Sequence, residues 1–390
     1  MLTHLDEYFI HQIPATVDRV VDSDPRWLDN HWFQAMDTEG RFVVGANFVV
    51  MPNNSVVDSG QIVQHGDKQF NLRYSREWQQ RGLRSERLNL SVGPSSMEIL
   101  EPGNKARFVL DSDNEHEMSY ELVFDTYLQP CEARSPIYNR AEGVRDILPY
   151  HEHLGRFTGW LKIEGRTYDI TPENCWGQRD RCWGTLGMGA GFGERFRTWL
   201  PPAPARAPTG RLHWHSHVQF EDIGFWWWLD EHLGQPRLNG TLGNSHGGVF
   251  DGTVTYPLGD EKEQVRLIDF KDYDLEFYPD GKFKGATTTV VDEKGEEHPL
   301  KFTILSRNST RWILGEGYGD PEFLGGYNGE FFHRYDTFDL EDPETIKKIT
   351  LGTTKWSNSE HAVRCEYKGR VGIGHLELVA AGPLPRWGIE

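Results

Sequence analysis

Two histidines flank a glutamate at the start of a segment with strand character. His151, Glu152 and His153 are consecutive, and alternate side chains of an extended chain point to opposite faces. The two histidines therefore share one face, and the glutamate lies on the other. Because histidine titrates near neutral pH, His151 and His153 are candidates for a general acid or base. The alternative is that they are ordinary polar residues where a strand begins.

A second charged motif lies between two tryptophans, Trp176 and Trp183. In a strand, Arg179 and Arg181 share a face and Asp180 lies opposite. A charge buried among tryptophans must be paired, so one interpretation is an Arg–Asp ion pair that holds a barrel closed. The other is that the aromatic surroundings shift the pKa of Asp180 and make it a proton donor or acceptor.

Three histidines alternate along a third segment, at His213, His215 and His217. Such a pattern can supply zinc or iron ligands. However, no glutamate or histidine elsewhere stands out as a third ligand, and the sequence contains no cysteine cluster and no H-E-x-x-H motif. We therefore favour a polar face that lines a cavity, with His213 and His215 as catalytic candidates, and we predict no metal and no cofactor.

Strand signals dominate the rest of the chain. Short alternating runs recur about every ten residues from Arg41 onward, and Glu164-Gly165 separates two of them as a hairpin turn would. No stretch of about 12 residues or more shows helical periodicity. We predict an all-β protein with two antiparallel barrel or sandwich domains. A proline-rich run suggests where they meet, giving domains over 1–197 and 211–390 and a linker over 198–210.

The composition excludes several classes of partner. The net charge of −18 disfavours binding to nucleic acid or to an anionic membrane. The N-terminus lacks the basic start and apolar run of a signal peptide, and no window approaches the roughly 18 apolar residues that span a membrane. The four cysteines are not spaced as metal ligands, so we predict a cytoplasmic protein with reduced thiols. The 14 tryptophans suit a barrel interior or a cavity wall.

Several of these stretches resemble the AttH-like and carotenoid 1,2-hydratase (hydroxyneurosporene synthase) superfamily. They are the hairpin GRFTGWLKIEGRTYDI, the G-x-R-D-x-x-W-G pattern over 177–184, LHWHSHVQFED and the C-terminal GRVGIGHLELV. The resemblance implies two lipocalin-like (calycin-type) β-barrels packed together, with an apolar cavity. It also implies activities such as those of cofactor-free hydratases, cyclases and isomerases. Cys182 departs from the family pattern, in which serine is typical.

We therefore predict a cofactor-independent lyase or isomerase, most specifically a hydratase or dehydratase. Its substrate would be a hydrophobic small molecule such as a terpenoid, steroid or aromatic compound. Asp180 would transfer one proton, a histidine would handle water, and aromatic rings would stabilise a developing cation. The candidates for binding the substrate are Trp176, Trp183, Trp214, Arg179 and Tyr168.

Two alternatives to this function remain open at the level of the sequence. One is a lipocalin-like carrier that binds an apolar ligand without chemistry. The other is a metal-dependent enzyme built on the strand that carries His213 and His215. A homodimer is compatible with either.

Overall fold

The computed structural model describes most of the chain. The described ranges are 3–9, 23–25, 27–78, 89–133, 137–139, 145–147, 149–185, 210–232, 237–239, 248–308, 310, 325–345, 359–381 and 383–388. These residues form strands, nearly all paired antiparallel, together with short 3-10 helices such as η1 (His4–Glu7), η2 (Pro52–Asn54) and η4 (Pro385–Trp387). The predicted all-β class is confirmed. Within these ranges, no helix has the length and hydropathy to cross a bilayer.

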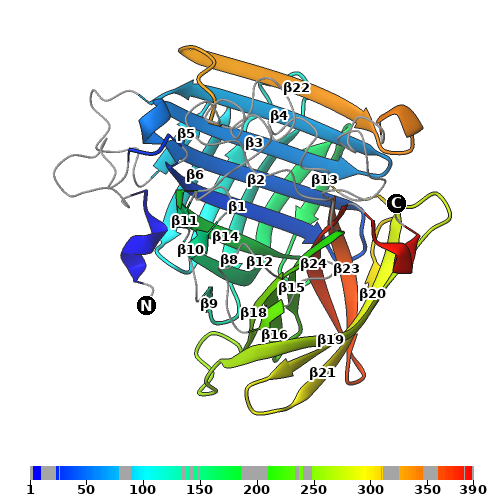
Figure 1. The fold of residues 1–390 in the computed structure, drawn as a ribbon. Helices are drawn as coiled ribbons and strands as arrows, with labels where there is room; N and C mark the ends of the chain where they lie inside the picture. The colour runs from blue at the N-terminus through cyan, green and yellow to red at the C-terminus, as the bar shows by residue number, and fades with distance from the viewer. Residues whose placement is uncertain are drawn as a thin grey trace.

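The first sheet curls into an open half-barrel, drawn in blue, cyan and green in Figure 1. Its main strands are β1 (Trp27–Asp37), β2 (Phe42–Met51), β3 (Val56–His65), β4 (Lys68–Glu77), β5 (Asn89–Val92), β6 (Ser95–Glu101), β7 (Lys105–Leu110), β8 (Ser119–Thr126), β12 (Tyr150–Ile163) and β14 (Cys175–Thr185). They follow the order β4-β3-β2-β1-β14-β12-β8-β7-β6-β5. Four short strands pair at its margins: β9 (Cys131–Glu132), β10 (Ile137–Asn139), β11 (Arg145–Ile147) and β13 (Arg166–Ile170).

The second sheet closes on itself. Its strands are β15 (Arg211–Gln219), β16 (Gly224–His232), β17 (Arg237–Asn239), β18 (Gly248–Thr255), β19 (Val265–Phe277), β20 (Phe283–Asp292), β21 (Glu297–Ile304), β23 (Ser359–Tyr367) and β24 (Arg370–Ala381). Because β16 pairs with both β15 and β18, the sheet returns to its first strand and no edge is left between them. The predicted double lipocalin-like architecture is confirmed, with one barrel closed and the other open.

One strand from the C-terminal half belongs to the first sheet. β22 (Phe331–Asp339), orange in Figure 1, pairs antiparallel with β4 over its whole length, from Phe331 opposite Arg76 to Asp339 opposite Lys68. The chain therefore leaves the second barrel, extends the first sheet and returns through β23. The predicted linker over 198–210 lies outside the described residues except for Gly210.

The three largest apolar clusters among the described residues hold these sheets. One fills the curl of the first sheet and includes Phe33 and Phe108. A second fills the closed barrel around Trp214 and Trp227. The third joins the two sheets, because Leu154 of β12 and Trp226 of β16 belong to the same buried cluster. Burial of this surface, at roughly 25 cal/mol per Å², favours the packing of the two sheets against each other.

The hairpin between β12 and β13 forms as predicted. Glu164 and Gly165 have φ values of 47° and 74°, which is the left-handed conformation that a two-residue hairpin turn requires. The strands continue directly from the turn, with Ile163 opposite Arg166.

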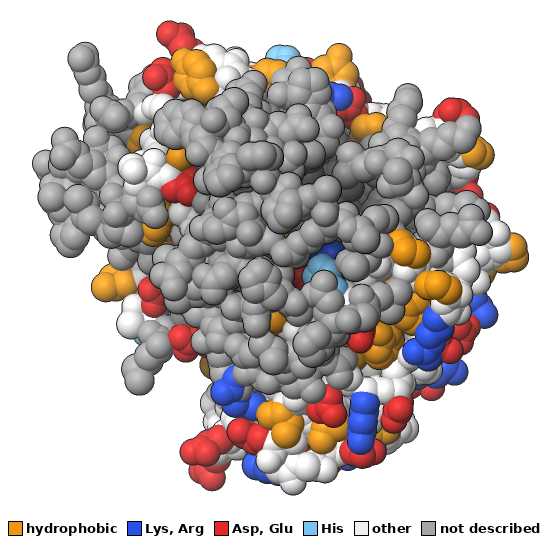
Figure 2. All heavy atoms as spheres, viewed as in Figure 1, with side chains coloured by type: hydrophobic (Ala, Val, Ile, Leu, Met, Phe, Trp, Pro, Cys, Tyr) orange, Lys and Arg blue, Asp and Glu red, His pale blue; other side chains and the backbone are white. Residues whose placement is uncertain are grey.

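The surface of the second barrel mixes both signs of charge. Figure 2 shows acidic and basic side chains interspersed over its lower part, and pairs such as Lys271–Glu297 and Lys368–Glu296 each have an N–O distance of 2.6 Å. Exposed pairs of this kind contribute at most about 1 kcal/mol. They give no single-sign surface of the kind that binds nucleic acid.

Candidate active site

Strands β12 and β14 run side by side and carry most of the sequence-predicted residues. His151 lies opposite Arg181 and His153 opposite Arg179, whereas Glu152 lies opposite Asp180. Because side chains alternate along a strand, the histidines and arginines share one face and the two carboxylates share the other. The two faces form two separate polar clusters.

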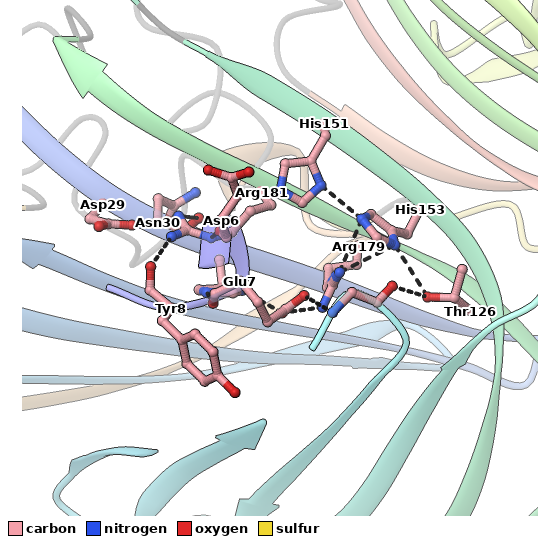
Figure 3. A network of polar contacts seen from close by, with 12 residues as sticks. Asp6, Glu7, Tyr8, Asp29, Asn30, Thr126, His151, His153, Arg179 and Arg181 are labelled. Atoms are coloured by element: carbon pink, nitrogen blue, oxygen red, sulfur yellow. Dashed lines mark hydrogen bonds and ion pairs between the residues drawn. The ribbon is translucent and has the colours of Figure 1, made fainter. Parts of the chain in front are cut away.

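The arginine cluster lies on the concave face of the first sheet and is drawn in Figure 3. Its members are His31 and six residues that the figure labels: Glu7, Asp29, His151, His153, Arg179 and Arg181. Each of the seven is at most 3% exposed. Arg179 forms an ion pair and hydrogen bond with Glu7, and its other terminal nitrogen lies 3.0 Å from Nε2 of His153. The neighbouring histidine ring nitrogens, Nδ1 of His151 and Nε2 of His153, are 2.7 Å apart.

The second arginine holds the N-terminal segment against the sheet. Arg181 forms a 2.5 Å ion pair with Asp29 and donates hydrogen bonds to the carbonyl oxygens of Asp6 and Tyr8. These carbonyls belong to or follow η1, whose capping box joins Thr3 and Asp6. The motif arginines therefore bind segments that lie far from them in the sequence.

The electrostatics of this cluster lower the pKa of two of its histidines, His153 and His31. Burial, followed by the nearby guanidinium of Arg179, holds the pKa of His153 well below its usual range. Burial and the charges of Arg181 and Arg179 do the same for His31. With the arginines paired to carboxylates, the cluster is internally compensated.

The carboxylate–histidine cluster lies between the two sheets. The first sheet supplies Tyr150, Glu152 and Asp180, and the closed barrel supplies His213, His215, His217, Glu360, His375 and Glu377. Glu152, which is fully buried, meets two histidines of β15. Its Oε2 lies 2.8 Å from Nε2 of His217, and its Oε1 lies 3.3 Å from Nε2 of His215.

Further polar side chains surround these contacts. Oε2 of Glu377 lies 3.6 Å from Nδ1 of His215 and 3.6 Å from Nε2 of His213. Nδ1 of His217 lies 3.4 Å from Nδ1 of His375, whose other nitrogen contacts Glu360. The Glu377 side chain is 30% exposed, so the cluster is not sealed on every side.

Asp180 is the second carboxylate on this face. The hydroxyl of Tyr150 donates a 2.5 Å hydrogen bond to Oδ2 of Asp180. Burial, reinforced by the charge of Glu377, raises the pKa of Asp180 to about 7. Burial and the charge of Asp180 likewise raise the pKa of Glu152 well above its usual range.

The histidines of this cluster differ from one another. Burial lowers the pKa of His215, but its contacts with Glu152 and Glu377 outweigh this effect and raise it. Burial and the neighbouring His215 and His375 hold the pKa of His217 well below its usual range. Proton donors and proton acceptors therefore lie within one cluster.

Aromatic and apolar side chains border the cluster. The Trp228 ring lies 4.7 Å from the His213 ring and 5.0 Å from the His215 ring, measured between centroids. The indole N–H of Trp226 donates a 2.9 Å hydrogen bond to Nε2 of His215. Tyr150 and Trp226 also belong to the apolar cluster that joins the sheets. An apolar group and proton-transfer groups are thus adjacent.

The structure separates the remaining predicted residues. Arg179 and Asp180 do not pair with each other, because neighbouring strand residues point to opposite faces; their partners are Glu7 and Tyr150. Trp183 lies with the arginine cluster, where the Arg181 guanidinium lies 5.3 Å from its ring centroid.

Three more candidates lie outside both clusters. Trp176 is stacked by Arg156, whose guanidinium carbon lies 3.3 Å from the ring centroid. Trp214 lies in the core of the closed barrel, because it occupies the face of β15 opposite the three histidines. Tyr168 accompanies His65 on the β12–β13 side of the first sheet, with 2.8 Å between the hydroxyl and Nε2.

Sequence reasoning did not select six residues of the carboxylate–histidine cluster, namely Tyr150, Glu152, His217, Glu360, His375 and Glu377. Glu152 and His217 belong to the two histidine motifs described from the sequence. The alternation of side chains along a strand could have identified both, because it places Glu152 on the face of Asp180 and His217 on the face of His215. Glu377 and His375 carry no local signal, because only the pairing of β24 with β15 brings them to the site.

Three side chains of the cluster could hold a metal ion. Glu152, His215 and His217 each offer one ligand atom, and these atoms all lie within 4.8 Å of one another. A second group on the second barrel, Asp292, Glu296 and His298, also has ligand atoms within 4.8 Å of one another.

Comparison with known proteins gives a family and a fold. The model of the "Family of unknown function (DUF8625)" matches residues 2–390. A comparison of the sequence with curated proteins found no match. Among solved structures, a putative AttH from Nitrosomonas europaea is similar with a TM-score of 0.50 and 9% identity, over 92% of this chain and 94% of that chain. This similarity confirms the AttH-like fold.

Two further structures align at lower TM-scores. Kievitone hydratase from Nectria haematococca gives a TM-score of 0.43 with 12% identity, over 98% of this chain and 93% of that chain. CghA gives 0.48 with 10% identity, over 92% and 89%.

Proposed function

Since the chain belongs to the family of unknown function DUF8625, we propose a function from its own residues: a lyase or isomerase that uses acid–base chemistry. The most specific form of the proposal is a hydratase or dehydratase. Its substrate is a small molecule with an apolar body, such as a terpenoid, steroid or aromatic compound.

The observation that carries the proposal is the meeting of Glu152 with His215 and His217 across the two sheets, at 3.3 and 2.8 Å. Acid–base catalysis requires a proton donor and a proton acceptor within hydrogen-bond reach of one substrate. Asp180, bonded to Tyr150, lies on the same face and is only partly buried. Carboxylates that serve only to hold a sheet pair with arginine elsewhere in this protein, as Glu7 and Asp29 do.

Hydration then proceeds with each atom accounted for. Asp180 gives its proton to one carbon of an alkene while Tyr150 holds the carboxyl in place. The water oxygen adds to the other carbon and keeps one proton as the product hydroxyl, and a histidine of β15 takes the second proton of that water. Solvent then returns a proton from the histidine to Asp180, which restores both groups. The Trp226 and Trp228 rings stabilise the cation that develops between these steps. Dehydration is the same sequence in reverse.

The carrier alternative expects an apolar site without a proton-transfer pair. The apolar cluster between the sheets suits such a ligand. The contacts of Glu152 with two histidines favour the enzyme.

The test is a screen of isoprenoid, steroid and phenolic alkenes in H₂¹⁸O, followed by mass spectrometry. The active protein should give products heavier by one labelled water. We expect Asp180→Asn to lower turnover by about 100-fold, the scale of a lost general acid, with little change in melting temperature. Asp169→Asn, an exposed aspartate on β13, is the matched control. An Asp180→Asn variant that keeps full turnover would contradict the assigned role of Asp180.

A further inference from the structure

Glu152, His215 and His217 are arranged as metal ligands. Their donor atoms are separated by 3.3 Å and 2.8 Å along the two glutamate–histidine contacts. Two ligands bound to one transition-metal ion at about 2.1 Å lie roughly 3.0–3.4 Å apart in octahedral or tetrahedral geometry. The three side chains come from β12 and β15, which are rigid elements of different sheets.

These short contacts do not have the angles of well-formed hydrogen bonds. Both carboxylate oxygens of Glu152 and Nε2 of His217 are completely buried, and none makes a hydrogen bond of acceptable geometry with the described residues. Buried polar atoms in this condition are costly, and a cation bound by them removes that cost.

The surroundings have the arrangement found around metal-bound histidines. Such histidines direct their second ring nitrogen to a carboxylate or another acceptor. Here Nδ1 of His215 faces Glu377 at 3.6 Å, and Nδ1 of His217 faces His375, which in turn contacts Glu360. The local charge also favours a bound cation. The carboxylates of Glu152 and Asp180 lie on this face of β12 and β14, whereas the guanidinium groups of Arg179 and Arg181 lie on the other face, in the arginine cluster.

We propose that Glu152, His215 and His217 bind one divalent transition-metal ion of the zinc, iron or cobalt class. Two imidazoles and one carboxylate suit these ions better than calcium or magnesium, which prefer oxygen ligands. This proposal differs from the sequence-based prediction of no metal, because Glu152 on another sheet would be the third ligand that the H-x-H pattern lacked. Three protein ligands leave coordination positions for water.

The metal site adds to the proposed function, but binding of the ion does not require that function to be correct. If that function holds, the ion would supply a water molecule beside the substrate and Asp180 would remain the acid. His213 would then be the β15 histidine that accepts the proton, because His215 and His217 would be ligands. Trp226 competes with the ion, because its indole N–H donates to the same His215 nitrogen.

The experiment titrates the full chain with Co²⁺ after treatment with EDTA. We expect about one Co²⁺ per chain at this site, with visible absorption bands, and displacement of the ion by Zn²⁺. Glu152→Gln and His217→Ala should each abolish these bands. Glu377→Gln should weaken binding by about 10–100-fold as an outer-shell change. Trp226→Phe should leave binding intact or tighten it. Glu164→Gln, a carboxylate on the neighbouring hairpin that contacts His65 and Lys68, is the matched control.

Two results would overturn the assignment. One is a folded wild-type protein and a folded Trp226→Phe variant that both show no Co²⁺ bands at 100 µM, on the order of a weak protein site. The other is binding that survives Glu152→Gln but is lost in His298→Gln, which would place the ion on the second barrel. Binding at Glu152 with hydration activity that is indifferent to EDTA would support the site and separate it from the reaction.

Discussion

The two polar clusters differ in the partners of their carboxylates, although alternate residues of the same strands build both. In the arginine cluster, Glu7 and Asp29 are paired with Arg179 and Arg181. In the carboxylate–histidine cluster, Glu152 contacts only histidines among the ion-pair partners in the described part of the chain. The pleat of β12 and β14 separates them, so one short stretch of sequence can stabilise the fold on one face and supply chemistry on the other.

The difference has an energetic basis. A guanidinium stays charged at any working pH and fixes its carboxylate in the ionised form. Imidazole gains and loses its proton near neutrality, so a carboxylate beside it can exchange protons. The identity of the partner therefore distinguishes a structural carboxylate from a reactive one.

The largest effect should come from breaking an arginine pair. Glu7→Gln leaves Arg179 buried without its countercharge, and we expect a loss of about 3–5 kcal/mol in the free energy of unfolding. Chemical denaturation measures it. The double variant Glu7→Gln/Arg179→Met should recover part of the loss. If Glu7→Gln costs no more than the exposed-pair variant Glu164→Gln, at most about 1 kcal/mol, the arginine cluster does not stabilise the fold.

A smaller loss of stability should appear when the pH is lowered. Burial and the nearby arginines depress the pKa of His31, so below about pH 6.5 the unfolded chain binds a proton that the folded chain does not. The free energy of unfolding should therefore fall by about 2 kcal/mol between pH 6.5 and pH 5 through this residue. His31→Phe, which keeps contacts with Phe9 and Phe33, should flatten the decline. Urea midpoints across this range measure the slope, and equal slopes in both proteins would contradict the prediction.

The smallest effect on stability should come from Glu152. Burial and the charge of Asp180 raise the pKa of Glu152, which favours the neutral form that glutamine resembles. We expect Glu152→Gln in metal-free protein to change the free energy of unfolding by less than about 1 kcal/mol. Denaturation beside Glu7→Gln gives the comparison directly. A loss of similar size in both variants would remove the distinction between the clusters.

Much of this arrangement could be predicted from local rules. Alternation placed His151 and His153 on one face and Glu152 on the other, and it separated Asp180 from its neighbouring arginines. The β-strand spacing and the turn at Glu164-Gly165 gave the fold class and one hairpin.

Long-range pairing set the limit. Arg179 binds Glu7, which lies 172 positions away in a segment with no clear strand pattern. Glu377 and His375 reach the site because β24 pairs with β15. Trp214 was predicted to bind substrate, but it lies in the core of the closed barrel. It occupies an even-numbered position on β15, so its side chain points away from the histidines at 213, 215 and 217. The sequence shows which residues of a strand share a face, but it does not show which part of the protein that face contacts.

The pairing of β22 with β4 also bears on the order in which the protein forms during synthesis. Residues 68–77 are made long before residues 331–339, so β4 remains a free sheet edge while most of the chain emerges. Unpaired edges are sites of association between chains. A half made by cutting between the two barrels would keep that edge exposed permanently, so the first sheet completes itself only as part of the whole chain.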